Sequence, residues 1–201
     1  MGISAQDVKA LRDRTGAGMM DAKAALQEAG GDFDKAIEVL RVKGQASAAK
    51  RGGRAAAEGA VASYIHAGGD IGTLVEVACE TDFVARTDQF QEFARDVALH
   101  VAAAAPRYVS VEDVPEQERE AERRVLTEQA AAEGKPEQVQ EKIVEGRMSK
   151  WLDEIVLTRQ RHVNEDKHNS KTLEELRTEL AANTGENIVI RRFARFQVGE
   201  E

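Results

Sequence analysis

Few side chains of this chain have the types and spacing that chemistry requires. The four histidines, His66, His100, His162 and His168, do not pair with one another or with cysteine at the spacing of a zinc site, so we expect packing or surface roles for them. Cys79 has no neighbouring basic motif that would favour its thiolate. No glycine-rich stretch has the spacing of a Walker or dinucleotide loop. The sequence therefore predicts no catalytic residues, no metal site and no cofactor.

Three carboxylates near the middle of the chain offer an alternative. Glu76, Glu80 and Asp82 lie close enough in sequence to face one divalent cation, which would suit a metal-dependent hydrolase. No histidine joins them in sequence, so the pattern disfavours this alternative. Titration with a divalent metal, followed by calorimetry, separates a hydrolase from a protein whose only activity is binding.

The segment most informative about function is Cys79–Arg86, which reads CETDFVAR and precedes a helix predicted to start near Asp88. It places Phe83 among polar residues in a tight connector. One interpretation is that Phe83 folds back as a core anchor, and the spacing alone favours this one. The other is that Phe83 protrudes as an apolar wedge beside Asp82 and enters a partner.

The first part of the chain reads as three short helices followed by a linker. Ser4 and Asp7 stand at capping-box spacing before the first helix. Apolar residues repeat at helical spacing through residues 4–43, which predicts a small three-helix bundle with a marginal core. Residues 44–60 are rich in Gly and Ala and read as a linker, although their first half can extend the third helix.

The rest of the chain mixes strand and helix periods. Residues 61–79 predict an antiparallel hairpin, 88–105 a strongly amphipathic helix, and 188–198 a third strand. Three further helices are predicted at 115–133, 136–155 and 172–183. The second of these is expected to bury Val139, Ile143, Met148, Trp151, Leu152 and Ile155. We therefore predict an α+β protein with a three-helix bundle in a domain at 1–54, and a three-stranded antiparallel sheet packed with helices in a domain at 55–201.

The charge distribution favours a protein partner over a nucleic acid. Residues 1–54 carry 10 basic and 7 acidic side chains, whereas residues 55–201 carry 18 and 29, for a net charge of −8. An acidic body lacks the positive footprint that phosphate binding requires, so we expect no direct nucleic-acid binding. A single cysteine excludes an intrachain disulfide, and no apolar run reaches membrane-spanning length. Because the N-terminus also lacks a signal-peptide pattern, we expect a cytoplasmic protein with no membrane partner.

Several strings, in the correct order, resemble the elongation factor Ts family over nearly the whole chain. The most diagnostic is Glu80–Arg86, with the sequence ETDFVAR. The others lie at 11–26 (LRDRTGAGMMDAKAAL), 31–41 (GDFDKAIEVLR), 64–77 (YIHAGGDIGTLVEV) and 141–148 (EKIVEGRM). A chance match of so many ordered motifs is very improbable. The chain looks like the short form of the family, which has a single core.

The resemblance implies a non-enzymatic guanine-nucleotide exchange factor for elongation factor Tu. In the family, the loop corresponding to Thr81, Asp82, Phe83 and Val84 enters the nucleotide domain of that GTPase and displaces Mg²⁺, so that GDP leaves and GTP replaces it. The partner is bound in its GDP-loaded and nucleotide-free states.

The resemblance further implies that the N-terminal bundle is like a ubiquitin-associated domain and also docks on the nucleotide domain. Met19, Met20 and Asp21 lie in its inter-helix loop. Met suits an adaptable apolar contact, but Met20 fits the bundle core equally well. Short forms of the family also allow a homodimer.

A third class of function is a ubiquitin-like or RNA adaptor that uses the basic bundle and linker. Lys43, Lys50, Arg51 and Arg54 would then give weak, salt-sensitive RNA binding. Isolation of the dominant partner from a cell extract distinguishes an adaptor from an exchange factor.

Overall fold

The computed structural model describes residues 3–134 and 136–200, which form two compact units. The first unit comprises the described residues up to Ala62 with 76–94 and 175–190, and the second comprises 63–75, 95–174 and 191–200. Both units contain segments that are distant in sequence. Each of the three sheet strands and the helix at 88–104 contains residues of both units, so the units share elements.

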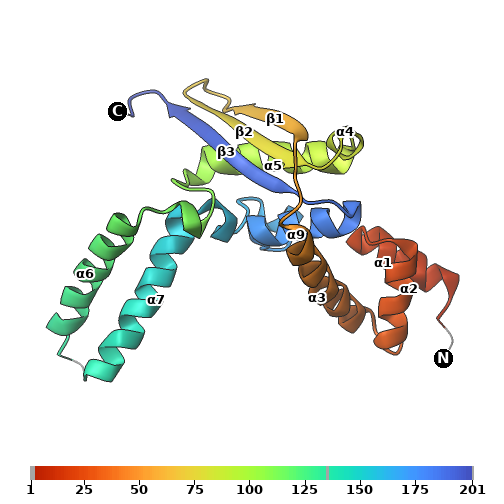
Figure 1. Cartoon of the computed structure of the whole chain (residues 1–201), viewed down its shortest axis with the longest axis horizontal. Coiled ribbons are helices and arrows are strands. Elements are labelled where there is room, and N and C mark those ends of the chain that lie inside the picture. The colour runs from red at the N-terminus through yellow and green to blue at the C-terminus, as the bar shows by residue number, and fades with distance from the viewer. Residues whose placement is uncertain (1–2, 135, 201) are drawn as a thin grey trace. The chain divides into compact units, whose positions relative to one another are not determined.

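Helices and strands follow one another in the order expected of a mixed fold (Figure 1). The elements are α1 Ala5–Thr15, α2 Met19–Glu28, α3 Phe33–Arg51, β1 Glu58–Ile65, β2 Ile71–Cys79, α4 Asp82–Ala85, α5 Asp88–Ala104, η1 Val111–Asp113, α6 Glu116–Ala132, α7 Glu137–Ile155, η2 Leu157–Arg159, α8 Glu165–His168, α9 Leu173–Thr184 and β3 Val189–Gln197. The predicted α+β class with its three-stranded antiparallel sheet is confirmed. Among the described residues, no helix is both long and apolar enough to cross a membrane.

The first three helices pack into the predicted small bundle. The capping box at the start of α1 is confirmed, because Ser4 Oγ accepts from the Asp7 N–H at 3.1 Å and the Asp7 carboxylate accepts from the Ser4 N–H at 3.0 Å. The bundle core consists of small and aliphatic side chains, Val8, Leu11, Ala22, Ala25, Leu26 and Ala36. So few large anchors leave the bundle dependent on its contacts with the rest of its unit.

The predicted linker is mostly ordered. α3 continues to Arg51 and β1 starts at Glu58, so only residues 52–57 lie outside a helix or strand. α3 approaches α9 closely, since a Cβ placed on Gly44 would lie 3.2 Å from the Cβ of Ala182. The predicted domain boundary after residue 54 falls inside the first unit. The division into 1–54 and 55–201 stays a prediction.

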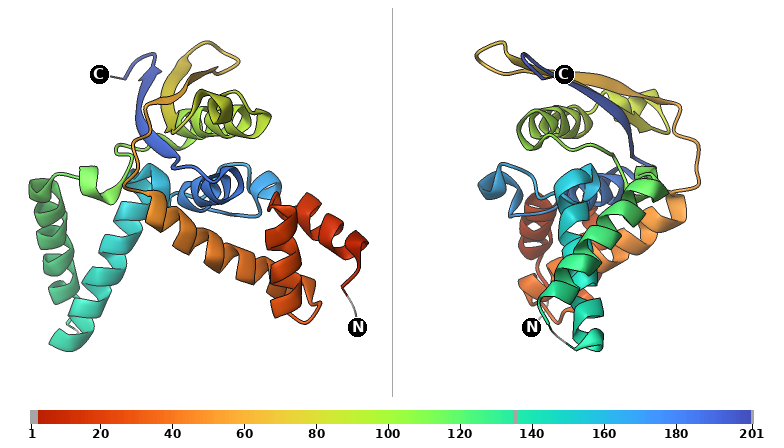
Figure 2. Two further views of the ribbon diagram at one scale, coloured as in Figure 1. Left: turned by 45° about the vertical axis from the view of Figure 1, so that its right-hand side comes forward. Right: turned by 90° about the vertical axis from the view of Figure 1, so that its left-hand side faces the viewer.

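The sheet has the order β1-β2-β3, and α5 runs along one of its faces (Figure 2). Thr73 and Val75 of β2 are buried, and the Thr73 hydroxyl donates to the Ala98 carbonyl of α5 at 2.8 Å. The predicted apolar stripe of α5 is confirmed, because Phe90, Phe93, Ala94, Val97, Ala98 and Val101 are all buried. The opposite face of the second unit's strands stays exposed, with Phe196 of β3 among its apolar side chains.

α6 and α7 form an antiparallel helical hairpin (Figure 1). Their shared core is Leu126, Ala130, Val144 and Met148, with Ile143 and Trp151 packed beside it. The predicted burial of Val139 is wrong, because this residue lies in the first turn of α7, near the tip of the hairpin, and is exposed. Val144 occupies the buried position instead.

Candidate functional site

The connector between β2 and α5 presents Phe83 to solvent. Its middle is a single helical turn, α4, and not the loop that the sequence predicts. Thr81 caps this turn in extended conformation, and Ala85, two positions after Phe83, is buried. The Phe83 side chain is 81% exposed, so it is not a core anchor and that interpretation is wrong.

An exposed phenyl ring on an ordered turn is a candidate contact for a partner. Fully burying such a side chain is worth roughly 1.5–3 kcal/mol, so the exposed ring leaves a driving force for binding. Asp82, next to it, is half-buried and pairs with the Arg86 guanidinium at 3.0 Å. Exposed pairs of this kind contribute little to stability, so the Asp82 carboxylate is available to a partner at low cost.

Segments distant in sequence hold the base of the turn. Asn187 donates its backbone N–H to Glu80 Oε1 at 2.7 Å and its side-chain amide to the Arg54 carbonyl at 2.8 Å. The Arg54 guanidinium lies 3.4 Å from the same Glu80 oxygen. The carboxylate of Glu186 also reaches this base. Sequence reasoning missed Glu186 and Asn187, because no local pattern links them to a segment more than 100 residues away.

Cys79 lies directly under the turn and is chemically quiet. Its thiol is fully buried and donates to the Thr81 carbonyl at 3.1 Å. Burial, with a smaller effect of the Glu186 charge, raises the pKa of the Cys79 thiol to about 11. The thiolate that a nucleophile requires is therefore scarce at neutral pH. Burial also keeps Cys79 from pairing with a second chain in this conformation.

The second group of candidate residues, Met19, Met20 and Asp21, forms the first turn of α2, so their predicted place in an inter-helix loop is wrong. Met20 is 75% exposed, so its placement in the bundle core is wrong. Met19 is also exposed. The two groups therefore lie on separate elements of the first unit, and each presents apolar side chains to solvent.

The three carboxylates of the hydrolase alternative do not gather around one point. Glu80 is bonded to Asn187 and Arg54, and Asp82 pairs with Arg86. Among the residues that the structure describes, the acidic and histidine side chains whose ligand atoms do cluster are Asp96, His162 and His168, all in the second unit. The observed geometry gives the hydrolase alternative no support.

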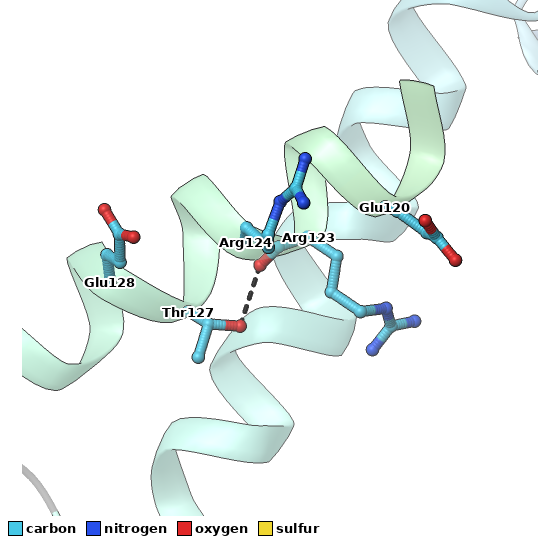
Figure 3. Close-up of a pocket in the computed structure, with 5 residues that line it drawn as sticks. All are labelled: Glu120, Arg123, Arg124, Thr127 and Glu128. Atoms are coloured by element: carbon cyan, nitrogen blue, oxygen red, sulfur yellow. Dashed lines mark hydrogen bonds between the residues drawn. The ribbon is translucent and has the colours of Figure 1, made fainter. Parts of the chain in front are cut away.

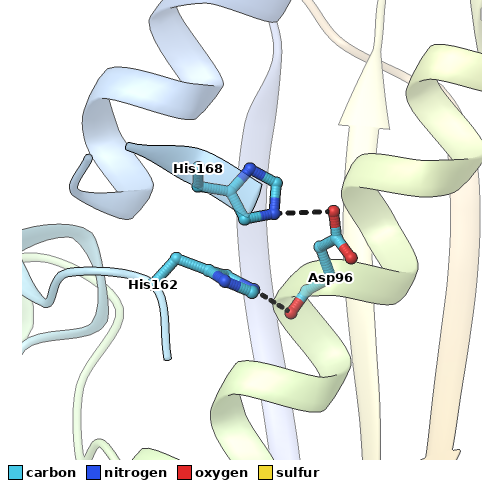
Figure 4. Close-up of side chains that lie close together, drawn as sticks. All are labelled: Asp96, His162 and His168. Carbon is cyan, nitrogen blue, oxygen red and sulfur yellow. Dashed lines mark hydrogen bonds and ion pairs between the residues drawn. The ribbon is translucent and has the colours of Figure 1, made fainter. Parts of the chain in front are cut away.

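The histidine cluster is built for packing (Figure 4). His162 Nδ1 accepts the Asn164 N–H at 3.0 Å, so Nε2 carries the proton and donates to the Asp96 carbonyl at 3.1 Å. Both ring nitrogens of His162 are thus engaged by the backbone, and Lys167 Nζ lies 2.8 Å from the Asp96 carboxylate. A metal ion would have to displace these partners, so the cluster does not suit one. The sequence did not predict the cluster because its members lie on separate elements.

His100 extends the same buried network. Its Nδ1 accepts the Val163 N–H at 3.2 Å, and its Nε2 therefore donates to Gln160 Oε1 at 2.9 Å. Burial, opposed by the Gln160 bond, lowers the pKa of His100 from 6.5 to about 4. The neutral ring is the form that the fold requires.

Acidification is expected to destabilise the protein through His100. Between pH 6.5 and 4 the unfolded chain binds a proton there that the folded chain does not. The neutral His100 ring therefore makes its full contribution to the free energy of unfolding above pH 6.5. This contribution is lost as the pH falls toward 4, by about 3 kcal/mol in total. Urea unfolding midpoints across this range measure the slope of stability against pH. His100→Gln should flatten it, whereas His66→Gln, at an exposed histidine, should not. An unchanged slope in His100→Gln contradicts this assignment.

The surface depressions are shallow. One lies on a single face of α6, lined by Glu120, Arg123, Arg124, Thr127 and Glu128. Glu120 and Arg123 extend to one side of the helix and Arg124 and Glu128 to another, and the Thr127 hydroxyl donates to the Arg123 carbonyl of its own helix at 2.7 Å (Figure 3). This depression is therefore a solvated helix surface and not a binding site for a small ligand.

A second depression lies on the outer sheet face, which we define by Ser63, Ile65, Leu74, Phe196 and Val198. Four of these five side chains are large, apolar and exposed. They come from β1, β2, β3 and the residue that directly follows β3, all in the second unit. A contiguous apolar patch of this kind is typical of an interface.

Comparison with known proteins gives a consistent result. The family model described as elongation factor TS matches residues 34–170, which include α4. The chain is 57% identical to elongation factor Ts of Carboxydothermus hydrogenoformans over 198 residues, which are 98% of this chain and 90% of that protein. It is 52% identical to elongation factor Ts of Syntrophus aciditrophicus over 201 residues, which are 100% of this chain and 98% of that protein.

Proposed function

Because the chain belongs to the elongation factor Ts family, we propose that it promotes the exchange of GDP for GTP on elongation factor Tu during translation elongation. It works in the cytoplasm, performs no covalent chemistry and holds no cofactor. The observation that carries the proposal is the exposed Phe83 on the capped turn of α4. A side chain that is apolar, exposed and held by an ordered backbone is suited to enter a partner.

The turn acts as a wedge in the nucleotide domain of elongation factor Tu. Phe83 enters the partner, with Asp82 perturbing polar groups beside it and Thr81 and Val84 completing the contact. Mg²⁺ demands nearly ideal octahedral geometry, so a small shift of its ligands weakens its binding. Without the cation the phosphate charge is poorly neutralised, and GDP dissociates faster.

The order of the turn before binding supports this role. The α4 turn is already helical and capped in the free chain, so binding does not have to order it. Preorganisation of this kind raises affinity because less conformational entropy is lost on association. The factor engages the GDP-bound partner and remains on the nucleotide-free partner until GTP enters.

The N-terminal bundle provides a second contact on the same partner through Met19, Met20 and Asp21. Two exposed methionines at the start of α2 offer a flexible apolar surface. Asp21 adds a carboxylate in the same turn. The contact anchors the factor while the α4 turn disturbs the nucleotide.

Release of fluorescent GDP from purified elongation factor Tu tests the proposal directly. The protein should accelerate release in a concentration-dependent way when unlabelled nucleotide is in excess. An unrelated GTPase serves as the specificity control. Release from elongation factor Tu at the unstimulated rate would rule out the exchange function.

Two copies of the chain pair through the outer sheet face. Leaving Ile65, Leu74, Phe196 and Val198 exposed is unfavourable, and a second copy buries them against an identical apolar surface. A symmetric sheet-on-sheet contact is also a common way for the open face of an antiparallel sheet to be buried.

Phe196→Glu is expected to convert the dimer to monomers in sedimentation velocity, because it places two like charges at an apolar contact. Phe196 is 70% exposed, so the monomer itself should keep its stability. Val125→Glu, on the exposed side of α6, is the matched control and should leave the mass unchanged. A wild-type protein that sediments as a monomer at tens of micromolar rejects the dimer.

A further inference from the structure

The turn that carries Phe83 is too short to hold its own shape. α4 has four residues, and isolated helices shorter than about 12 residues are marginal in water. The bond from the Val84 N–H to Thr81 Oγ1, which caps the turn, is long at 3.4 Å. The rest of the chain must therefore fix the direction in which Phe83 points.

Glu186 supplies this support from 105 residues away in sequence. Its Oε2 accepts the backbone N–H groups of Glu80 at 3.0 Å and Thr81 at 3.1 Å. Its Oε1 accepts the Thr81 hydroxyl at 2.6 Å. Hydrogen bonds to an ionised carboxylate are about twice as strong as neutral ones. Three of them converge on the two residues that precede the Asp82-Phe83 pair.

Glu186 also sets the direction of the cap. A threonine hydroxyl has one proton, and in Thr81 this proton is donated to Glu186. The lone pairs of the same oxygen are then left to accept from the Val84 N–H. Loss of the carboxylate frees the hydroxyl to rotate, and the turn loses its cap as well as its two backbone bonds.

The position of Glu186 is itself fixed. Gly185, at φ +74°, adopts the left-handed conformation that ends α9 and turns the chain toward the base of α4. The next residue, Asn187, is buried and donates its N–H to Glu80. Glu186 accepts hydrogen bonds from the backbone of residues 80–81, and Glu80 accepts one from the backbone of Asn187. These reciprocal bonds fix segments 80–81 and 186–187 relative to each other.

We propose that Glu186 is a positioning residue for nucleotide exchange, which holds the Phe83 turn in its binding-competent conformation without reacting itself. The inference rests on the proposed exchange function. Without Glu186 the turn samples other conformations, and the apparent affinity falls in proportion to the competent fraction. Once bound, the turn has the same geometry, so the maximal rate at saturating factor is retained.

Glu186→Ala is expected to lower the second-order rate constant of stimulated GDP release about tenfold while the rate at saturation stays within about twofold of wild type. Glu186→Gln should be intermediate, since its carbonyl accepts the two backbone N–H groups but its amide cannot accept the Thr81 proton. Glu128→Ala, which removes an exposed carboxylate on α6, should match wild type. Circular dichroism on the same samples gives the folded fraction, so that all rates refer to folded protein.

The double variant separates positioning from general stabilisation. Glu186→Ala and Thr81→Ala both remove the bond between the carboxylate and the Thr81 hydroxyl, so their combined effect should be smaller than the product of the single effects, although the two backbone bonds of Glu186 remain in Thr81→Ala. If wild type stimulates release and Glu186→Ala has an unchanged rate constant, the positioning role is overturned. It is also overturned if unfolded protein explains the loss of rate, or if the effects of the two single variants multiply in full in the double variant. Absence of stimulation by the wild-type protein would instead reject the exchange function itself.

Discussion

Replacing Phe83 with alanine is expected to slow stimulated GDP release about thirtyfold or more, because a central aromatic anchor at an interface is worth ~2 kcal/mol or more. The same change should leave the free energy of unfolding nearly unaltered. Phe83 is 81% exposed and contributes little to the core, so its truncation leaves no cavity. Function and stability should therefore separate in this one variant.

Phe90→Ala is the matched control, because Phe90 is fully buried at the start of α5, seven residues further along the chain. Truncation there should cost about 3–5 kcal/mol of stability. Its surviving folded fraction should still stimulate GDP release at the normal rate. Urea midpoints and GDP release measured on the same samples give both quantities. A large midpoint shift in Phe83→Ala, with normal release by the folded fraction, would show that the wedge is misassigned.

The neighbouring carboxylate should matter in the same assay. Asp82→Ala removes the group that we expect to perturb polar atoms near the nucleotide, and it should also slow release. Its exposed pair with Arg86 contributes little to stability, so the urea midpoint should hold. If the urea midpoint is unchanged while GDP release slows, Asp82 acts in the contact with the partner and not in folding.

Local patterns in the sequence were sufficient to predict most of the architecture. The capping box at Ser4, the hairpin of β1 and β2, and the stripe of α5 depend on residues within a few positions of one another. Periodicity and capping report such short-range relations directly. The burial of Val139 was mispredicted because helical period alone does not show where a hairpin ends.

The arrangement around the site depended on contacts that no local pattern reveals. Phe83 is a single aromatic residue in a connector, and a connector has no helical or strand periodicity. The sequence therefore could not show whether its side chain points toward the core or toward solvent. Glu186 contacts Thr81 across 105 positions in sequence, and the tilted rings of His100 and His162, 62 positions apart, lie 5.5 Å from each other between centroids. Long-range pairs of this kind form only when the tertiary structure brings separate elements together.

GDP and Mg²⁺ are expected to weaken binding of the protein to elongation factor Tu about a thousandfold. In the proposed mechanism the factor displaces Mg²⁺ from the GDP-bound partner, and the loss of the cation weakens GDP binding. Coupling between two ligands is reciprocal, so a thousandfold effect in one direction, about 4 kcal/mol, must appear equally in the other. The factor therefore prefers the nucleotide-free partner, and an excess of GTP sets the direction of the cycle.

Calorimetric titrations of elongation factor Tu without nucleotide, with GDP and Mg²⁺, and with GDP and a chelator measure this coupling. If displacement of the cation is the main step, chelation should remove much of the difference between the first two dissociation constants. For Phe83→Ala, the dissociation constants for the GDP-loaded and the nucleotide-free partner should differ by a smaller factor than for wild type, because the wedge produces the coupling. Equal dissociation constants for wild type with and without GDP and Mg²⁺ would leave no free energy to drive exchange, and the mechanism would fail.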